Sequence, residues 1–390
     1  MTIFYPVPEP MLSPKARFIQ IINTAHALAC AGAAVKLITG GVNCPNGSTL
    51  QETLLSHFSL MPHPNLEIIS LPMLRKNEGG KSALPFSVSM VFNAALIGYL
   101  IAQEKADSVI FVRHLKTAAL LIKLKRLHGM PVVFESHEIF HLTTEKISAR
   151  KRLRRMESRV YRGADAIAAI TERLRGDLVQ LFSLEAATSI TIPDAVRGDM
   201  IEAGLPYEQR RFIFYAGGFY PWKGVDLLIE AMRYMHGQML IIAGGGQRLK
   251  ELAALAAGMG LSGRVNFVGQ LSHADVIELL RQTKVAVIPN MPESVSIYSS
   301  PLKMFEYMAL QCPIAAANIP GVSEILTDGK DAVFFTPGDA ASLCAALKTL
   351  IDNPDLAKRT AAAAQDLVKN FTYEKRGQSI IDFISGTFYN

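Results

Sequence analysis

Residues 211–231 read RFIFYAGGFYPWKGVDLLIEA, so a hydrophobic run, a turn with two adjacent glycines and an amphipathic run follow one another directly. A buried strand, a tight turn and a helix in this order form the repeating unit of parallel α/β sheets. The glycines let the backbone approach a ligand, and Lys223 in the turn could offer a point charge to a phosphate. A plain connection with a solvated lysine would have the same composition.

Strand-like runs recur on both sides of this stretch, with helical stretches between them. They occupy residues 34–39, 66–71, 108–112, 131–135 and 166–170, and then 212–215, 239–243, 265–268, 285–289, 314–317 and 332–335. This alternation predicts parallel sheets with helices on both faces. We therefore expect an α/β protein with two Rossmann-like domains.

The length of 390 residues suits two such domains. Residues 192–210 contain Pro193 and Gly204 and show no clear periodicity, which predicts a linker. The expected division is 1–195 and 196–370, with a C-terminal helix at 371–390 that packs back toward the first domain. Parallel sheets bind ligands at the carboxyl ends of their strands, so we expect a cleft between the domains.

The composition indicates an ordered globular protein, because 49% of the residues are apolar. The four cysteines show no metal-ligand spacing and the N-terminus shows no secretory signal, so a cytoplasmic location is expected. Residues 83–103 carry no charge and approach the length of a membrane span. Polar residues and a proline dilute this segment, and we interpret it as a buried helix.

Residues 299–309, SSPLKMFEYMA, contain the strongest signal for a binding site. Serine before proline favours a helix start with Pro301 at the first helical position. Lys303 then lies in the first turn, where the helix dipole disfavours a cation unless an anion is bound. Glu306, one turn later, could accept hydrogen bonds from ribose or sugar hydroxyls. A capped surface helix is the alternative interpretation.

Residues 299–326, SSPLKMFEYMALQCPIAAANIPGVSEIL, resemble the donor-binding segment of family 4 retaining glycosyltransferases of the GT-B fold. The blocks YAGGFYPWKGVDLLIEA, LIIAGGGQRLKEL and RVNFVGQLSHADVIELLRQTKVAVIPN are similar to that family's preceding blocks in the same order. In the N-terminal half, RMESRVYRGADAIAAITERLRGDL and ITIPDAV are similar to the end of its acceptor domain.

The resemblance implies a hexosyltransferase that uses a nucleotide sugar, with an acceptor-binding N-terminal domain and a donor-binding C-terminal domain. Transfer would retain the anomeric configuration, with a donor phosphate oxygen taking the acceptor proton. Lys223, Lys303 and helix amides would hold the leaving diphosphate in place of a metal. A UDP-sugar is expected over a GDP-sugar. The expected donor-binding residues are Gly217, Gly218, Lys223, Leu271, Ser299, Ser300, Pro301, Leu302, Lys303 and Glu306.

Two positions depart from the family pattern. Many members have an arginine where this chain has Gly218, and many have a glutamate where it has Tyr298. The first departure would shift the diphosphate contacts onto Lys223 and Lys303. The second removes a carboxylate that grips the donor sugar, so the identity of that sugar cannot be transferred from the family.

On the acceptor side, candidate residues follow two predicted strands. Arg113 and His114 follow SVIFV, and His137 follows PVVFES. His114 aligns with a residue that family members place near the donor sugar, which would make it catalytic together with Lys223 and Glu306; a structural hydrogen-bonding role is the alternative. The expected acceptor-binding residues are Lys15, Arg113, His114 and His137.

Residues 137–141, HEIFH, also match the HExxH zinc signature. That signature requires a helix that places both histidines on one face, whereas here it follows a buried strand directly. We therefore expect no metal site at this position, and no metal cofactor.

Residues 146–162 contain eight basic residues and one acidic residue, Glu157. The segment is either a solvated helix face or a surface that docks on anionic lipid at the inner face of the membrane. The second interpretation suits a lipid-linked acceptor and the net charge of +6. Nucleic acid is not expected as a partner, because recognised motifs are missing.

Three functions remain open at this point. A glycosyltransferase of envelope glycan or polysaccharide synthesis is preferred. A sugar-nucleotide epimerase or phosphorylase could share the fold, and Gly218 and Tyr298 raise the third option, an inactive nucleotide-sugar-binding protein.

Overall fold

The computed structural model describes residues 1–11, 15–41, 49–73, 87–293 and 295–389. The chain divides into two compact units. The first unit comprises Met1–Pro193 together with Tyr373–Asn390, and the second comprises Asp194–Thr372. The C-terminal helix therefore belongs to the same unit as the N-terminus.

The first unit is built on a seven-stranded sheet in the order β3-β2-β1-β4-β5-β6-β7, and its strand pairs are all parallel. The strands are β1 (Thr2–Val7), β2 (Ala34–Gly40), β3 (Leu66–Leu71), β4 (Ser108–Val112), β5 (Val132–Ser136), β6 (Ala166–Ala169) and β7 (Ser189–Thr191). The central strands are fully buried, which explains their continuous hydrophobic sequence.

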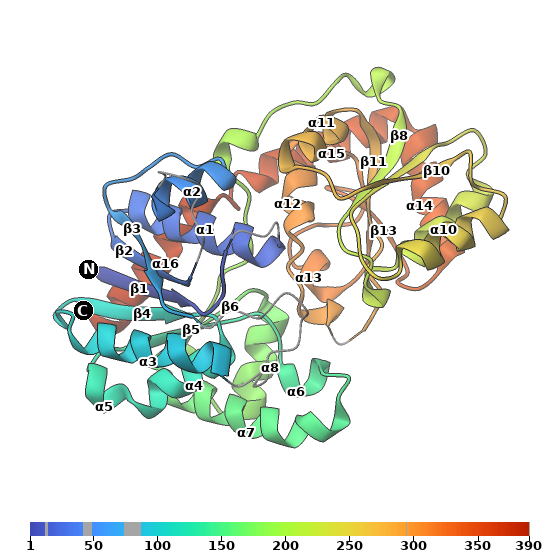
Figure 1. Cartoon of the computed structure of the whole chain (residues 1–390). Helices are drawn as coiled ribbons and strands as arrows, with labels where there is room; N and C mark the ends of the chain where they lie inside the picture. Colours follow the sequence, from blue (N-terminus) through green and yellow to red (C-terminus); the bar gives the residue numbers. More distant parts are fainter. Residues whose placement is uncertain (12–14, 42–48, 74–86, 294, 390) are drawn as a thin grey trace. The chain divides into compact units, whose positions relative to one another are not determined.

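Helices cover both faces of this sheet (Figure 1). They are α1 (Ala16–Cys30), α2 (Leu50–His57), α3 (Ser87–Ile101), α4 (Leu115–Lys123), α5 (Lys125–His128), α6 (Phe140–Thr143), α7 (Ile147–Gly163), α8 (Glu172–Phe182) and α16 (Tyr373–Phe388). Helices α1 and α16 pack together on one face, whereas α3 and α4 lie on the other. A side chain at Gly377 of α16 would meet the backbone of Ala27 at 2.8 Å, so a glycine allows this close approach.

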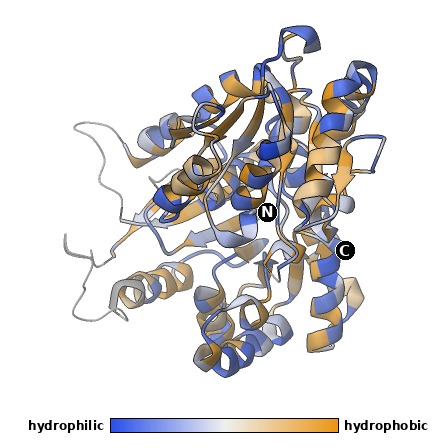
Figure 2. Cartoon of the chain, turned by 90° about the vertical axis from the view of Figure 1, so that its right-hand side faces the viewer, coloured by the Kyte–Doolittle hydropathy of each residue, from blue (hydrophilic) through white to orange (hydrophobic). Residues whose placement is uncertain are grey.

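The second unit contains a six-stranded parallel sheet in the order β10-β9-β8-β11-β12-β13. Its strands are β8 (Phe212–Ala216), β9 (Leu240–Ala243), β10 (Val265–Gly269), β11 (Thr283–Ile288), β12 (Ile314–Ala317) and β13 (Val333–Phe335). Its α-helices are α9 (Val225–Ala231), α10 (Leu249–Gly258), α11 (His273–Arg281), α12 (Leu302–Ala309), α13 (Pro320–Ser323), α14 (Ala340–Asp352) and α15 (Pro354–Val368). Several of these helices carry hydrophobic and hydrophilic residues along their length, as expected for helices that pack on a sheet (Figure 2).

Both sheets have a point at which the strand order reverses. In the first unit it lies between β1 and β4, and in the second between β8 and β11. Connections leave these neighbouring strands toward opposite faces, and the loops at their carboxyl ends are where open α/β sheets bind ligands. The turn after β8 and the segment after β11 are the two parts of the predicted donor site.

These observations confirm the predicted α/β class with two parallel sheets. Two strands were not predicted, β1 and β7. Strand β1 contains Pro6, and its pairing with β4 ends at Phe4, so the proline lies where only β2 pairs with the strand. Strand β7 has only three residues.

The uncharged segment 83–103 is described from residue 87 onward. Helix α3 buries Phe92, Leu96 and Leu100 on one face and exposes Met90. The interpretation as a buried helix is confirmed in part, because this segment is a helix of which only one face is buried, while residues 83–86 lie outside the described residues. Within the described chain, no helix combines the length and apolar character that a membrane crossing requires.

Candidate functional site

Glycines bring two loops of the second unit into direct contact. Gly217 directly follows β8 and Gly244 directly follows β9, with φ angles of 148° and 137°. A Cβ atom on Gly244 would lie 2.0 Å from the Gly217 carbonyl oxygen, and the Gly217 N–H donates to the Ala243 carbonyl at 2.9 Å. Only glycine fits such an approach. The turn after β8, at the point where the strand order reverses, therefore packs closely on the loop after β9.

Lys303 lies beside this glycine turn. Its side chain comes from the first turn of α12, is only 8% exposed, and places Nζ 3.7 Å from the centre of the Tyr215 ring. A Cβ atom on Gly217 would lie 3.3 Å from that Nζ atom. Among the described residues, Nζ has no hydrogen-bond partner. A buried ammonium without a hydrogen-bond partner is costly, so this position is complementary to an anion.

Lys223 supplies a second cation to the same turn. It ends the 3₁₀ turn Pro221–Lys223, and its Nζ atom lies 3.8 Å from the centre of the Trp222 ring. Burial lowers the pKa of Lys223 to about 7. Burial and, secondarily, the charge of Lys223 hold the pKa of Lys303 well below its ordinary range. An anion bound between the two lysines would restore both charges.

The start of α12 differs from the prediction. Pro301 is the N-cap with extended backbone angles, and the first helical residue is Leu302. The prediction that serine caps this helix is wrong, because both hydroxyls are engaged elsewhere. Ser299 donates to the Ser296 carbonyl at 3.0 Å, and Ser300 accepts from the Asp194 N–H at 3.1 Å. Lys303 nevertheless occupies the first turn, as expected.

The structure gives an explanation for one of the two positions that depart from the family pattern, Gly218. A Cβ atom on Gly218 would lie 2.9 Å from the ring of Tyr220, so the aromatic ring covers the place from which a longer side chain would extend. Tyr298 is 2% exposed and belongs to the 3₁₀ turn Ser296–Tyr298. The cationic role at Gly218 can pass to Lys303, whereas Tyr298 supplies no carboxylate.

Glu306 lies one turn after Lys303 on α12. Its Oε1 atom accepts a hydrogen bond from His273 Nε2 at 3.0 Å. That hydrogen bond raises the pKa of His273, against the effect of burial. Leu271, in the loop between β10 and α11, packs against the core of the second unit. His273 was not among the predicted site residues.

In the first unit, His114 forms the N-cap of α4. Its Nδ1 atom accepts from the Thr117 N–H at 3.4 Å and lies 3.0 Å from the Thr117 hydroxyl. Burial lowers the pKa of His114 to about 4, so the ring is neutral near pH 7. With Nδ1 acting as acceptor, the ring proton resides on Nε2. His114 can therefore donate one hydrogen bond from Nε2.

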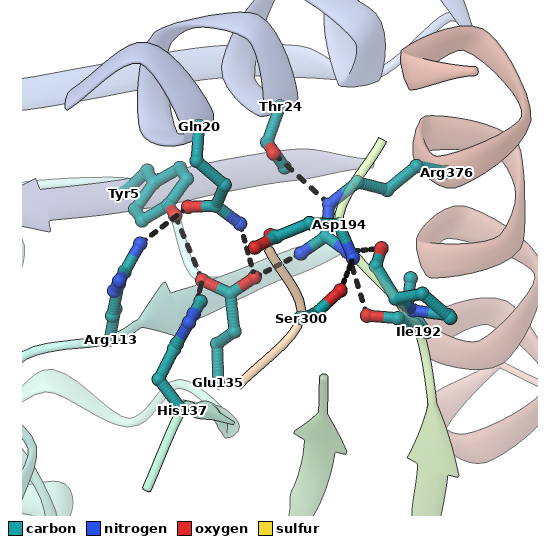
Figure 3. Close-up of polar contacts among 11 residues, drawn as sticks. Tyr5, Gln20, Thr24, Arg113, Glu135, His137, Ile192, Asp194, Ser300 and Arg376 are labelled. Carbon is teal, nitrogen blue, oxygen red and sulfur yellow. Dashed lines mark hydrogen bonds and ion pairs between the residues drawn. The ribbon is translucent and has the colours of Figure 1, made fainter. Parts of the chain in front are cut away.

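A buried polar cluster surrounds Glu135 at the end of β5 (Figure 3). Its carboxylate accepts from Tyr5 at 3.2 Å, from Gln20 at 2.9 Å and from Arg376 of α16. Burial opposes ionisation of Glu135, but His137 and Arg376 outweigh it and lower the pKa of the carboxyl group. Arg376 also donates to the Ile192 carbonyl at 2.7 Å and to Thr24 at 3.2 Å.

The predicted residues Arg113 and His137 border this cluster. Arg113 donates to Gln20 Oε1 at 2.6 Å, and His137 Nε2 lies 3.2 Å from Glu135 Oε2. Burial and the nearby Arg113 charge lower the pKa of His137 to about 4. Lys15, in contrast, is exposed at the N-cap of α1, with Nζ 5.7 Å from the Phe18 ring centre.

The two histidines of the HExxH match have separate partners. His137 lies in the loop after β5 beside Glu135, whereas His141 lies in the short helix α6 and contacts Glu157 of α7 at 2.6 Å. Within the described ranges, no three His, Cys, Asp or Glu residues form a group that could hold a metal ion.

The basic segment 146–162 forms most of α7. Its eight basic residues are exposed, while Glu157, Val160 and Tyr161 face inward. Two hydrophobic side chains near the start of α7, Leu142 and Ile147, are 41% and 76% exposed. The helix is thus amphipathic, with a cationic outer face.

Two family models match most of this chain. Residues 20–195 match the family model described as "Glycosyl transferase 4-like domain", and residues 196–367 match "Glycosyl transferases group 1". A glycogen synthase of Mycobacterium tuberculosis is 29% identical over 230 residues, which cover 56% of this chain and 53% of that protein. The chain thus matches about half of that relative's length.

Solved structures show the same fold. A sucrose-phosphate synthase from Thermosynechococcus elongatus superposes with a TM-score of 0.80 at 17% identity, over 100% of this chain and 99% of that one. HepE of Anabaena, solved in complex with UDP, gives a TM-score of 0.74 at 18% identity, over 99% and 100%. The two family models together span residues 20–367, and the chain belongs to the family 4 glycosyltransferases of the GT-B fold.

Proposed function

We propose that this protein transfers a sugar from a nucleoside diphosphate sugar to an acceptor hydroxyl, with retention of configuration. The observation that carries the proposal is the buried ammonium of Lys303 beside the glycine turn of the second unit, which has no hydrogen-bond partner among the described residues. An unpaired buried cation, a second lysine and an open glycine backbone at a sheet's reversal point are complementary to a diphosphate.

In this reaction the bond between the anomeric carbon and the diphosphate oxygen breaks, and a bond to the acceptor oxygen forms. The acceptor proton passes to an oxygen of the leaving diphosphate. Lys223 and Lys303 would stabilise the charge that develops on this leaving group, which is the main contribution that fixed charges make to such a step. Glu306 would accept hydrogen bonds from the ribose, and Leu271 would contact the base.

The first unit would bind the acceptor, with Lys15, Arg113, His114 and His137 as the candidate residues. His114 is neutral and donates from Nε2, so we assign it the role of a hydrogen-bond donor to a sugar hydroxyl rather than that of a general base. We propose a UDP-sugar as the donor; the UDP bound to HepE, a protein of the same fold, supports this choice.

We further propose that the exposed cationic face of α7 docks on anionic lipid at the cytoplasmic face of a membrane, where a lipid-linked acceptor for envelope glycan or polysaccharide synthesis would be found. Eight exposed basic residues beside the exposed Ile147 suit such a surface. In a sedimentation assay, the protein should bind vesicles containing phosphatidylglycerol and lose most of that binding when Arg150, Arg154 and Arg155 are replaced by glutamine. Equal binding to uncharged phosphatidylcholine vesicles would contradict the proposal.

The transferase proposal is tested by incubating the protein with UDP-sugars and measuring UDP release, with and without candidate acceptor alcohols. We expect release that Lys223→Ala and Glu306→Ala each reduce by about 100-fold. Unchanged release in both variants would contradict the site. An isomerised sugar formed from donor alone would favour the epimerase, and nucleotide binding without turnover would favour an inactive binding protein.

The two lysines also predict how sugar-donor binding depends on pH. Because burial lowers the pKa of Lys223 to about 7, free Lys223 loses its proton above that pH, while the bound diphosphate favours the charged form. Affinity for a UDP-sugar should therefore fall as the pH rises above 7, by up to about tenfold per pH unit from the titration of Lys223. Calorimetry in two buffers of different ionisation enthalpy should show proton uptake at pH 8; constant affinity up to pH 9 would contradict the assignment.

A further inference from the structure

One contact in the second unit is not explained by the family resemblance, the hydrogen bond between His273 and Glu306. His273 is the first residue of α11, and Glu306 lies on α12, 33 positions later in the chain. The distance between Nε2 and Oε1 is 3.0 Å. The His273 side chain is 45% exposed and the Glu306 side chain 18% exposed. The pair is thus accessible to a ligand from the histidine side.

The hydrogen bond restricts what the carboxylate can do. Glu306 Oε1 is occupied by His273, whereas Oε2 accepts no hydrogen bond from the described residues. An aromatic ring that donates to one oxygen fixes the rotation of the carboxylate, so the other oxygen points in a defined direction. Glu306 and Lys303 form no ion pair in the described chain, although the Glu306 charge partly offsets the lowering of the Lys303 pKa by burial.

The position of His273 also connects two parts of the sugar-donor site. The loop before it follows β10, the strand next to β9, and contains Leu271, which is among the residues that the family resemblance places in the sugar-donor site. The Ser272 hydroxyl accepts from the Asp275 N–H at 3.2 Å and fixes the start of α11. His273 therefore extends from a capped helix start to Glu306 of α12.

We propose that His273 is a positioning residue for nucleotide recognition, which orients the Glu306 carboxylate so that its free oxygen accepts the ribose hydroxyls of the sugar donor. This inference rests on the proposed function, because it assigns a partner to a residue of that binding site. It predicts that removing His273 weakens recognition of the ribose, while the diphosphate contacts of Lys223 and Lys303 persist.

The test compares the binding of UDP with that of 2′,3′-dideoxy-UDP by calorimetry, so that each variant yields a ratio of two dissociation constants. The wild type should prefer UDP by about tenfold or more, since a hydrogen bond to a charged group is lost with the dideoxy ligand. Glu306→Ala should reduce the ratio to about 1. His273→Ala should reduce it at least about threefold, and His273→Gln, which retains a donor N–H at the same distance, should restore it.

Two further measurements distinguish a specific role of His273 from a general effect of the substitution. His236→Ala replaces an exposed histidine elsewhere in the second unit and should leave the ratio unchanged. In an NMR titration, the pKa of the His273 ring should fall in Glu306→Gln, because the hydrogen bond to Glu306 raises it. A fall of the UDP affinity in His273→Ala with an unchanged ratio would indicate a merely structural role and overturn the proposal.

The outcomes also separate this inference from the proposed function. If the wild type binds neither nucleotide, the proposed function fails and this inference fails with it. If the wild type discriminates, Glu306→Ala abolishes discrimination and His273→Ala leaves it intact, the sugar-donor site stands and only the role of His273 is refuted.

Discussion

Replacing Lys303 by methionine should lower kcat/KM for the sugar donor by about 100-fold or more and at the same time stabilise the protein. The ammonium would otherwise hold the leaving diphosphate, and loss of one such group costs about 100- to 1,000-fold in rate. Without ligand, the same ammonium is buried without a hydrogen-bond partner in the described chain, and removing it should increase the free energy of unfolding by about 1 kcal/mol. Methionine preserves the packing on Tyr215.

The single tryptophan, Trp222, lies in the second unit, so its fluorescence during urea unfolding reports on the unit that contains Lys303. Lys284→Met is a matched control, because Lys284 also lies near an aromatic ring, 5.7 Å from the centre of Tyr207, but away from the glycine turn. It should change neither activity nor stability appreciably. Retained activity in Lys303→Met, or a loss of stability in that variant, would refute the interpretation of Lys303 as an anion-binding residue.

The second large effect is expected at Arg376. Arg376→Met should destabilise the first unit by about 3–5 kcal/mol, because it leaves the buried carboxylate of Glu135 without its principal cationic partner. The Arg376 and Glu135 side chains are 2% and 0% exposed, and Arg376 also bonds the carbonyls of Ile192 and Pro193. The double variant Glu135→Gln with Arg376→Met should recover part of this loss, since no unpaired charge remains.

Hydrogen exchange of peptides from β5 and α16 measures this stability in the first unit directly. Arg173→Met is the control, because Arg173 forms a helix-surface pair with Asp177 at 2.9 Å and is 52% exposed. It should cost less than about 1 kcal/mol. If β5 and α16 exchanged their amide hydrogens at the same rate in Arg376→Met as in Arg173→Met, the cluster around Glu135 would not contribute to the stability of the first unit.

Most of the fold could be predicted from the sequence, because buried parallel strands are continuous hydrophobic runs. Strands β3, β4 and β12 begin and end where the prediction placed them. Two strands were missed for local reasons. Prolines interrupt the hydrophobic pattern around β1, and strand β7 has only three residues. The start of α12 was misassigned because Ser300 bonds Asp194, a contact across 106 positions that no local pattern reveals.

Some residues of the candidate site could likewise be predicted from local sequence, whereas others depend on contacts that only the fold reveals. Lys223 and Lys303 could be predicted as site residues from the sequence, because each lies in a turn or helix start whose local chemistry favours an anion. Arg376 and His273 were missed because their partners, Glu135 and Glu306, are distant in the chain. An arginine within an amphipathic helix and a histidine after a serine cap are unremarkable in sequence, and only the fold shows which carboxylate each one contacts.

The most direct test of the central claim, that the second unit binds a nucleoside diphosphate through Lys223 and Lys303, is a thermal-shift titration of the whole protein with uridine, UMP, UDP and UDP-sugars. A ligand that binds only the folded state raises Tm as its concentration increases. UDP and UDP-sugars should raise Tm, uridine and UMP should have little effect, and Lys303→Met should abolish the shift. Equal shifts with UMP and UDP, or an unchanged UDP shift in Lys303→Met, would contradict the claim.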